Sequence, residues 1–164
     1  MTTVSSVDVF KEIRRKTKVY NARLLRVKKA YTKLRDTDPT VVNERTGEVD
    51  AEETMFAFAS LKKAGFKLME ASFMAVADAS QDAKYFESEI RLGKADRIIE
   101  NKGFTKITSD LRESVILSNP ELKDLKVAIE KLKAFSRIVD KYCDSLMADE
   151  VNYRKAAEKR LSGF

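Results

Sequence analysis

The sequence predicts an all-α fold built from long amphipathic helices. The 164-residue chain has five glycines and two prolines, so few turns interrupt its elements. Helix-forming residues dominate a composition that is 35% charged and 43% hydrophobic. Apolar residues recur every three or four positions over long stretches. We therefore expect an elongated helical bundle or coiled-coil-like assembly that forms a homo-oligomer.

Residues 1–37 predict a basic N-terminal helix, an arm that starts at Ser5 or Ser6 and runs to about Arg35. From Thr17 onward its apolar positions alternate by three and four, which is typical of a heptad seam: Tyr20, Leu24, Val27, Tyr31 and Leu34. A basic helix this long would fray alone, so it needs a partner helix. Residues 38–50 predict a linker, with a turn at Gly47 and a brief extended stretch at residues 41–42.

Residues 51–164 predict a helical body. Its first helix begins near Asp50 or Ala51 and continues to a turn at Gly103, with a bend or break in the weakly apolar stretch 77–82. The apolar face of this helix is broad and rich in Phe and Met, and we expect it to be fully buried: Met55, Phe56, Phe58, Leu61, Phe66, Leu68, Met69, Phe73, Met74 and Val76.

Two further helices complete the predicted body. A short helix is capped by Thr105 or Ser109 and ends at Ser118. Asn119 is then an expected N-cap, with Pro120 at the first position of a helix that runs towards Leu161. This last helix carries a nearly heptad apolar stripe, and together with the seam of the first helix it favours oligomerisation.

The composition argues against catalysis. The chain has no His, which removes the commonest metal ligand and the usual general base near neutral pH. The single Cys143 forms no internal disulfide, which favours a reducing compartment. There is no Gly-rich phosphate loop. We expect no enzyme activity, no catalytic residues, no metal and no cofactor.

The apolar runs of the sequence are short. None reaches the roughly 18 residues of a transmembrane helix, and the N-terminus lacks the apolar stretch of a signal peptide. We expect a soluble, cytoplasmic protein with no membrane partner.

The net charge of +6 is unevenly distributed. Residues 1–40 hold eleven Lys/Arg and four Asp/Glu, whereas residues 41–100 hold eight and twelve. Two explanations stay open. The basic segment faces a polyanion, or it docks on the acidic middle of a neighbouring copy.

Two basic clusters are the candidate nucleic-acid-binding residues. Phosphate backbones bind such surfaces through counterion release. We expect residues 91, 94 and 97 to share one helical face, and two lysines flank the Gly103 turn. The candidate residues are Arg14, Arg15 and Lys18 in the first cluster, and Arg91, Lys94, Arg97, Lys102 and Lys106 in the second.

Other side chains have two possible roles each. Tyr20 and Tyr31 are able to stack on bases, but their place on the heptad seam favours core packing. Phe104, at the Gly103 turn, is a stacking residue or a hydrophobic staple of the next helix. Asp78 and Asp82 have the spacing of a weak cation site, but a solvated or ion-paired face is the favoured interpretation.

The order of features from about residue 72 onward resembles that of phage UvsY-type recombination mediators. The resemblance is carried by three segments in order. They are residues 94–99 (KADRII) leading to Lys102 and Gly103, then residues 109–117 (SDLRESVIL), then a long helix with Phe135, Val139, Cys143 and Leu146. Members of that family are small helical proteins that bind single-stranded DNA and help load a RecA-like recombinase.

The resemblance implies a function for the second basic cluster. Arg91, Lys94, Arg97 and Lys102 would contact phosphates, and oligomerisation would add weak sites by avidity. It also implies a RecA-like recombinase or a single-strand-binding protein as partner, and the host cytoplasm as location if a phage encodes the chain. The alternative is a phage structural or protein-interaction module, for assembly or against the host, with no nucleic-acid role.

Overall fold

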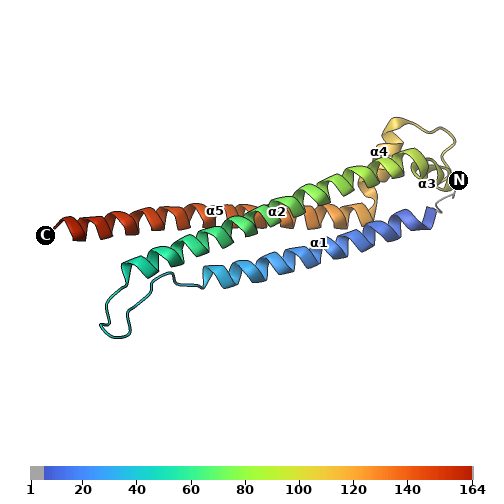
Figure 1. The fold of residues 1–164 in the computed structure, drawn as a ribbon. Coiled ribbons are helices and arrows are strands. Elements are labelled where there is room, and N and C mark those ends of the chain that lie inside the picture. The colour runs from blue at the N-terminus through green and yellow to red at the C-terminus, as the bar shows by residue number, and fades with distance from the viewer. Residues whose placement is uncertain (1–5, 164) are drawn as a thin grey trace. The chain divides into compact units, whose positions relative to one another are not determined.

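The computed structural model describes residues 6–163, with side chains from Val9 onward, and confirms the all-α fold. The described helices are α1 (Ser6–Arg35), α2 (Ala51–Gly93), α3 (Ala95–Asn101), α4 (Ser109–Ser118) and α5 (Pro120–Ser162) (Figure 1). Between α1 and α2, the expected turn forms at Gly47, and Val42 and Val49 form an isolated antiparallel bridge around it that the sequence did not predict. The expected cap Ser5 lies outside the described residues. None of the described helices combines the length and hydropathy needed to cross a membrane.

The chain divides into two compact units. Unit 1 comprises Met1–Leu24 and Met74–Lys133, and unit 2 comprises Leu25–Phe73 and Ala134–Phe164. α1, α2 and α5 each contribute residues to both units, whereas α3 and α4 belong to unit 1. The helix predicted as a basic arm therefore supplies part of each unit.

The predicted seam of α1 packs inside the chain. Tyr20, Leu24 and Val27 are buried. In unit 2, Tyr31 meets the rings of Phe135 and Tyr142 edge-on, at centroid distances of 5.5 and 5.6 Å. Because other helices of the same chain cover this seam, it gives no reason of its own to expect oligomers.

α5 begins as predicted. The side-chain oxygen of Asn119 accepts a hydrogen bond from the backbone N–H of Leu122 at 2.9 Å, and Pro120 is the first helical residue. Its apolar stripe is buried in both units: Leu122, Leu125, Ile129, Leu132, Val139, Cys143 and Leu146. The cap of α4 is Thr108 rather than Thr105 or Ser109, because the Thr108 side chain accepts from the backbone N–H of Leu111.

α2 is unbroken through residues 77–82, so a break in the helix there is ruled out. In unit 1, Asp82 accepts from the Tyr20 hydroxyl and pairs with Lys16 at 3.0 Å, and Asp78 pairs with Arg23 at 2.9 Å. These contacts hold the weakly apolar stretch against α1. The helix ends instead at Gly93, and Lys94 alone separates it from α3.

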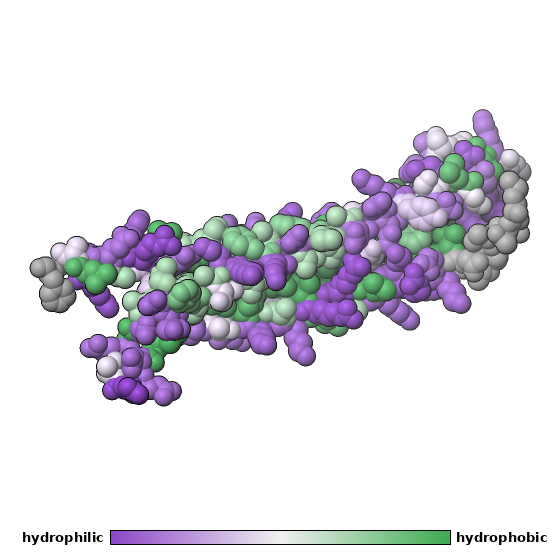
Figure 2. All heavy atoms as spheres, viewed as in Figure 1, coloured by the Kyte–Doolittle hydropathy of each residue, from purple (hydrophilic) through white to green (hydrophobic). Residues whose placement is uncertain are grey.

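The expectation that the Phe- and Met-rich face of α2 is fully buried is also wrong. Phe58, Leu61 and Leu68 are buried, but Phe56, Phe66, Phe73 and Met74 are exposed. The apolar residues of α2 cover a wider arc than the helices packed on it. In unit 2 the covered stripe is the one that includes Gly65, which lies against Tyr142 and Cys143 of α5. Figure 2 shows the resulting apolar surface where α2 and α5 lie together, among hydrophilic residues.

Candidate nucleic-acid interface

Unit 1 brings the two predicted basic clusters together. Arg14 on α1, Lys94 between α2 and α3, and Arg97 on α3 line one cavity of about 370 Å³, which we call the basic cavity. Its other lining residues are Phe10, Ile98, Asn101 and Glu121. Because three cations from distant parts of the sequence converge there, the cavity suits an anionic group such as a phosphate.

One carboxylate reduces the net positive charge of the basic cavity. Glu121, in the first turn of α5, accepts a hydrogen bond from Arg14 at 3.1 Å. In the described part of the chain, Lys94 and Arg97 have no ion pair. Two of the three cations therefore have no carboxylate partner that would compete with a ligand.

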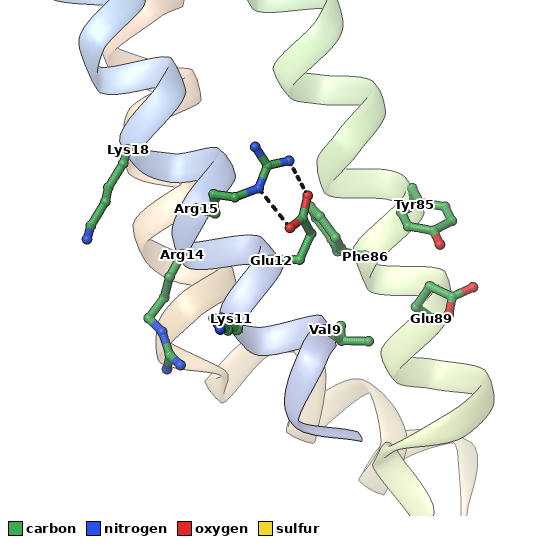
Figure 3. A pocket seen from close by; sticks show the side chains of 9 residues that line it. All are labelled: Val9, Lys11, Glu12, Arg14, Arg15, Lys18, Tyr85, Phe86 and Glu89. Atoms are coloured by element: carbon green, nitrogen blue, oxygen red, sulfur yellow. Dashed lines mark hydrogen bonds and ion pairs between the residues drawn. The ribbon is translucent and has the colours of Figure 1, made fainter. Parts of the chain in front are cut away.

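Arg14 also borders a second hollow, a groove of about 700 Å³ between α1 and α2 that we call the aromatic groove. Figure 3 shows Arg15 and Glu12 on the side of α1 that faces α2, with Phe86 directed towards them from α2 and Tyr85 on the outward side of that helix. The same figure shows Arg14 and Lys18 reaching out from the other side of α1. The remaining residues that line the aromatic groove are Val9, Lys11 and Glu89.

The cations of the aromatic groove differ in availability. Arg15 is hydrogen-bonded to Glu12, and this bond lowers the pKa of Glu12 below its ordinary value. The salt bridge holds the Arg15 guanidinium against its own helix. Lys18 is exposed and has no ion pair among the described residues, so it is the freer cation.

Tyr85 is a groove residue that the sequence did not single out. Its side chain is 58% exposed, and its ring lies 5.5 Å from that of buried Phe86, at an interplanar angle of 62°. Adjacent helical residues point about 100° apart, and here Phe86 is buried whereas Tyr85 is exposed. The adjacency of the two rings was the signal available in the sequence. An exposed ring in a hollow that cations also line has the chemistry of a base-stacking platform.

Arg91 does not join the basic cavity. α2 ends at Gly93 and α3 begins at Ala95, so the single helical face expected for residues 91, 94 and 97 is interrupted. Arg91 pairs instead with Glu113 of α4 at 2.6 Å. Arg112 and Asp96 form a second bridge between α4 and α3, also at 2.6 Å. Arg91 therefore attaches α4 to the end of α2.

Lys102 and Lys106 flank the turn after α3. Gly103 has a φ of +85°, the left-handed conformation expected of a residue that ends a helix. Both lysines and Phe104 are exposed, and neither lysine has an ion pair within the described residues. Asn101, which lines the basic cavity, directly precedes this turn.

Both seam tyrosines are packing residues. Tyr20 is 2% exposed, and burial, followed by the hydrogen bond to Asp82, raises the pKa of its hydroxyl. Burial raises the pKa of Asp82, but the hydrogen bonds from Tyr20 and Lys16 outweigh it, so the pKa lies below its ordinary value. Tyr20 and Tyr31 are therefore not available to stack on bases, and Asp78 and Asp82 form the ion-paired face.

The described residues contain no group of three or more His, Cys, Asp or Glu side chains able to hold a metal ion. No family model, no curated protein and no solved structure matches the chain. The resemblance to recombination mediators is accordingly carried by the sequence pattern alone.

Proposed function

We propose that this chain is a non-enzymatic accessory protein that binds single-stranded DNA and helps load a RecA-like recombinase. The observation that carries the DNA-binding part is the basic cavity, where Arg14, Lys94 and Arg97 converge. Sites for single strands combine cations that follow the backbone with aromatic rings on which bases stack. Tyr85 supplies such a ring in the aromatic groove, which shares Arg14 with the cavity.

The route of the strand follows from these two hollows. Phosphates occupy the basic cavity, and an adjoining base stacks on the exposed face of Tyr85. Lys102 and Lys106 extend the positive charge along the chain beyond Asn101. The contacts proposed here are to phosphates and to the face of a ring, so binding should depend little on base sequence.

Fluorescence anisotropy with labelled oligo-dT tests the DNA-binding part. The affinity should fall steeply as salt increases, because each phosphate contact releases counterions. An affinity that stays constant between low and moderate salt would exclude the proposal. An RNA oligomer and a duplex of equal length measure the preference for single-stranded DNA.

The recombinase part rests on the sequence resemblance. It is tested by assembling a RecA-like recombinase on DNA already coated with a single-strand-binding protein. The chain should shorten the lag before filament growth. A lag that is unchanged at saturating chain would leave a DNA-binding protein without a mediator role.

A protein-interaction module with no nucleic-acid role is the second candidate. The exposed phenylalanines of α2 favour it, because apolar surface of this kind is typical of helix docking. This candidate predicts that capture of a protein partner survives charge reversal at Arg14, Lys94 and Arg97. The first candidate predicts that the same charge reversal abolishes oligo-dT binding.

A further inference from the structure

The part of α2 that lies in unit 2 carries a second apolar stripe beside its buried seam. Its members follow one another at intervals of four and three residues, the spacing of a heptad seam: Met55, Ala59, Lys62, Phe66, Met69 and Phe73. Lys62 is the one polar member, and its ammonium is held by Glu150 of α5 at 2.7 Å. We call this row the outer stripe.

The outer stripe is open to a partner. Phe66 is 37% exposed and Phe73 45% exposed, Ala59 is exposed, and the two methionines are half-buried. The row is about 28 Å long at the helical rise per residue. A single exposed apolar residue is ordinary, but a continuous row at heptad spacing matches the footprint of another helix.

Two opposite charges lie on the outer edge of this stripe. Lys63 and Glu70 are seven residues apart, on the same line as Phe56, and all three residues are exposed. Lys63 and Glu70 have no ion pair in the described part of the chain. The edge therefore presents one cation and one anion two turns apart on the same line.

This charge pattern is its own complement when the helix is reversed. Suppose that two copies of the outer stripe pack antiparallel, with Phe66 of each beside Met69 of the other. Flanking positions of the same kind then meet across the pair, so Lys63 lies opposite Glu70 of the second copy, and by symmetry Glu70 lies opposite its Lys63. In a parallel pair, neither of these contacts between Lys63 and Glu70 would form.

We infer that two copies of this chain associate through an antiparallel, two-fold pairing of their α2 outer stripes. A two-fold interface requires a surface that is self-complementary, and the outer stripe meets this requirement in its row of apolar residues and in its charge pattern. The inference deepens the proposed function: a dimer would place two DNA sites in one particle and add their affinities by avidity, and this role rests on the proposed function. The contact itself is tested without nucleic acid.

Charge reversal is a sharp test, because Lys63 and Glu70 are about 10 Å apart along their own helix and do not pair there. The dimer dissociation constant is measured by analytical ultracentrifugation, between about 1 and 100 µM chain. K63E alone and E70K alone each place two like-charged pairs at the interface, and each should weaken the dimer roughly tenfold. The K63E/E70K double variant restores both pairs and should return to within about threefold of the parent.

Three controls accompany the measurement. K155E changes an exposed lysine of α5 and should leave the dimer constant unchanged. F66S/F73S removes the apolar contact and should leave a monomer. Helix content by circular dichroism confirms that each variant is folded.

Several results would overturn the inference. One is a parent chain that is monomeric throughout this range, and another is a dimer whose constant is unaffected by the single reversals. A monomer that binds phosphatidylglycerol vesicles through Phe66 and Phe73 would assign the stripe to a lipid surface instead. Oligo-dT binding, measured separately, distinguishes a failed interface from a failed DNA site.

Discussion

Glu121 of α5 accepts a hydrogen bond from Arg14 of α1 at 3.1 Å, inside the cavity that Lys94 and Arg97 also line. A carboxylate at this position competes with any phosphate for the Arg14 guanidinium. The DNA site that we propose therefore contains its own attenuating group.

Removing this carboxylate should strengthen DNA binding. Glu121→Gln keeps the shape of the side chain and frees Arg14, and we expect oligo-dT to bind about threefold more tightly at low salt. The matched control is Glu158→Gln, which removes an exposed charge in unit 2 and should change the affinity little. Weaker binding by Glu121→Gln would mean that Glu121 orients Arg14 rather than opposing the ligand.

Tyr85 should contribute through its ring and not through its hydroxyl. Replacing a stacking aromatic by alanine costs about 1–3 kcal/mol per base. Tyr85→Ala should therefore weaken oligo-dT binding at least about fivefold, whereas Tyr85→Phe should bind like the parent. Equal affinities for all three chains, measured by anisotropy, would remove Tyr85 from the site.

The contact between Tyr20 and Asp82 should stabilise unit 1. Tyr20→Phe removes the donor and leaves a carboxylate that still pairs with Lys16, so we expect a loss of about 1 kcal/mol in the free energy of unfolding. Urea denaturation at neutral pH measures this loss. An unchanged midpoint would show that the hydroxyl exchanges this bond for water at no cost.

The carboxyl group of Asp82 should also make the free energy of unfolding depend on pH in the acidic range. The pKa of Asp82 is lowered in the folded chain from its ordinary value of 3.8, so the stability that it contributes is complete above that value. The contribution is lost as the pH falls below 3.8 through the folded pKa. Asp82→Asn should flatten this part of the stability curve, and Asp110→Asn, at an exposed position, should not. Parallel curves for Asp82→Asn and the parent would contradict the assignment.

Gly65 should tolerate only a small side chain. A Cβ atom there would lie 3.3 Å from the Cys143 sulfur and 3.6 Å from the Tyr142 ring. Gly65→Leu therefore overpacks unit 2 and should cost about 1–3 kcal/mol. Gly93→Ala is the control, because its Cβ meets nothing within 4 Å. Thermal denaturation that gives equal losses for both variants would contradict this packing.

The sequence predicted the features that depend on neighbouring residues. The Asn119–Pro120 start of α5, the Gly103 turn and the seam of α1 all follow from local spacing and capping chemistry. The helix does not break at residues 77–82, where Asp78 and Asp82 pair with residues of α1. No local pattern contains those partners.

The candidate site also depended on packing between distant segments. The spacing identified Arg14 and Arg97 separately, but their common cavity arises only when α1 packs beside α3 in unit 1. Likewise, the apolar pattern of α2 could not tell which of its two stripes would be covered. The small Gly65 admits Tyr142 and Cys143 of α5 against one stripe and leaves Phe66 and Phe73 of the other exposed.

The most direct test of the proposed DNA site is the salt dependence of oligo-dT binding by a chain in which Arg14, Lys94 and Arg97 are all alanine. If each contacts a phosphate, the slope of log affinity against log salt should become less steep by about 2. The control, with alanine at the exposed Lys123, Lys131 and Lys155, carries the same net charge and should keep the parent slope. Equal slopes for the two triple variants would contradict the account, because binding would then depend on overall charge and not on the basic cavity.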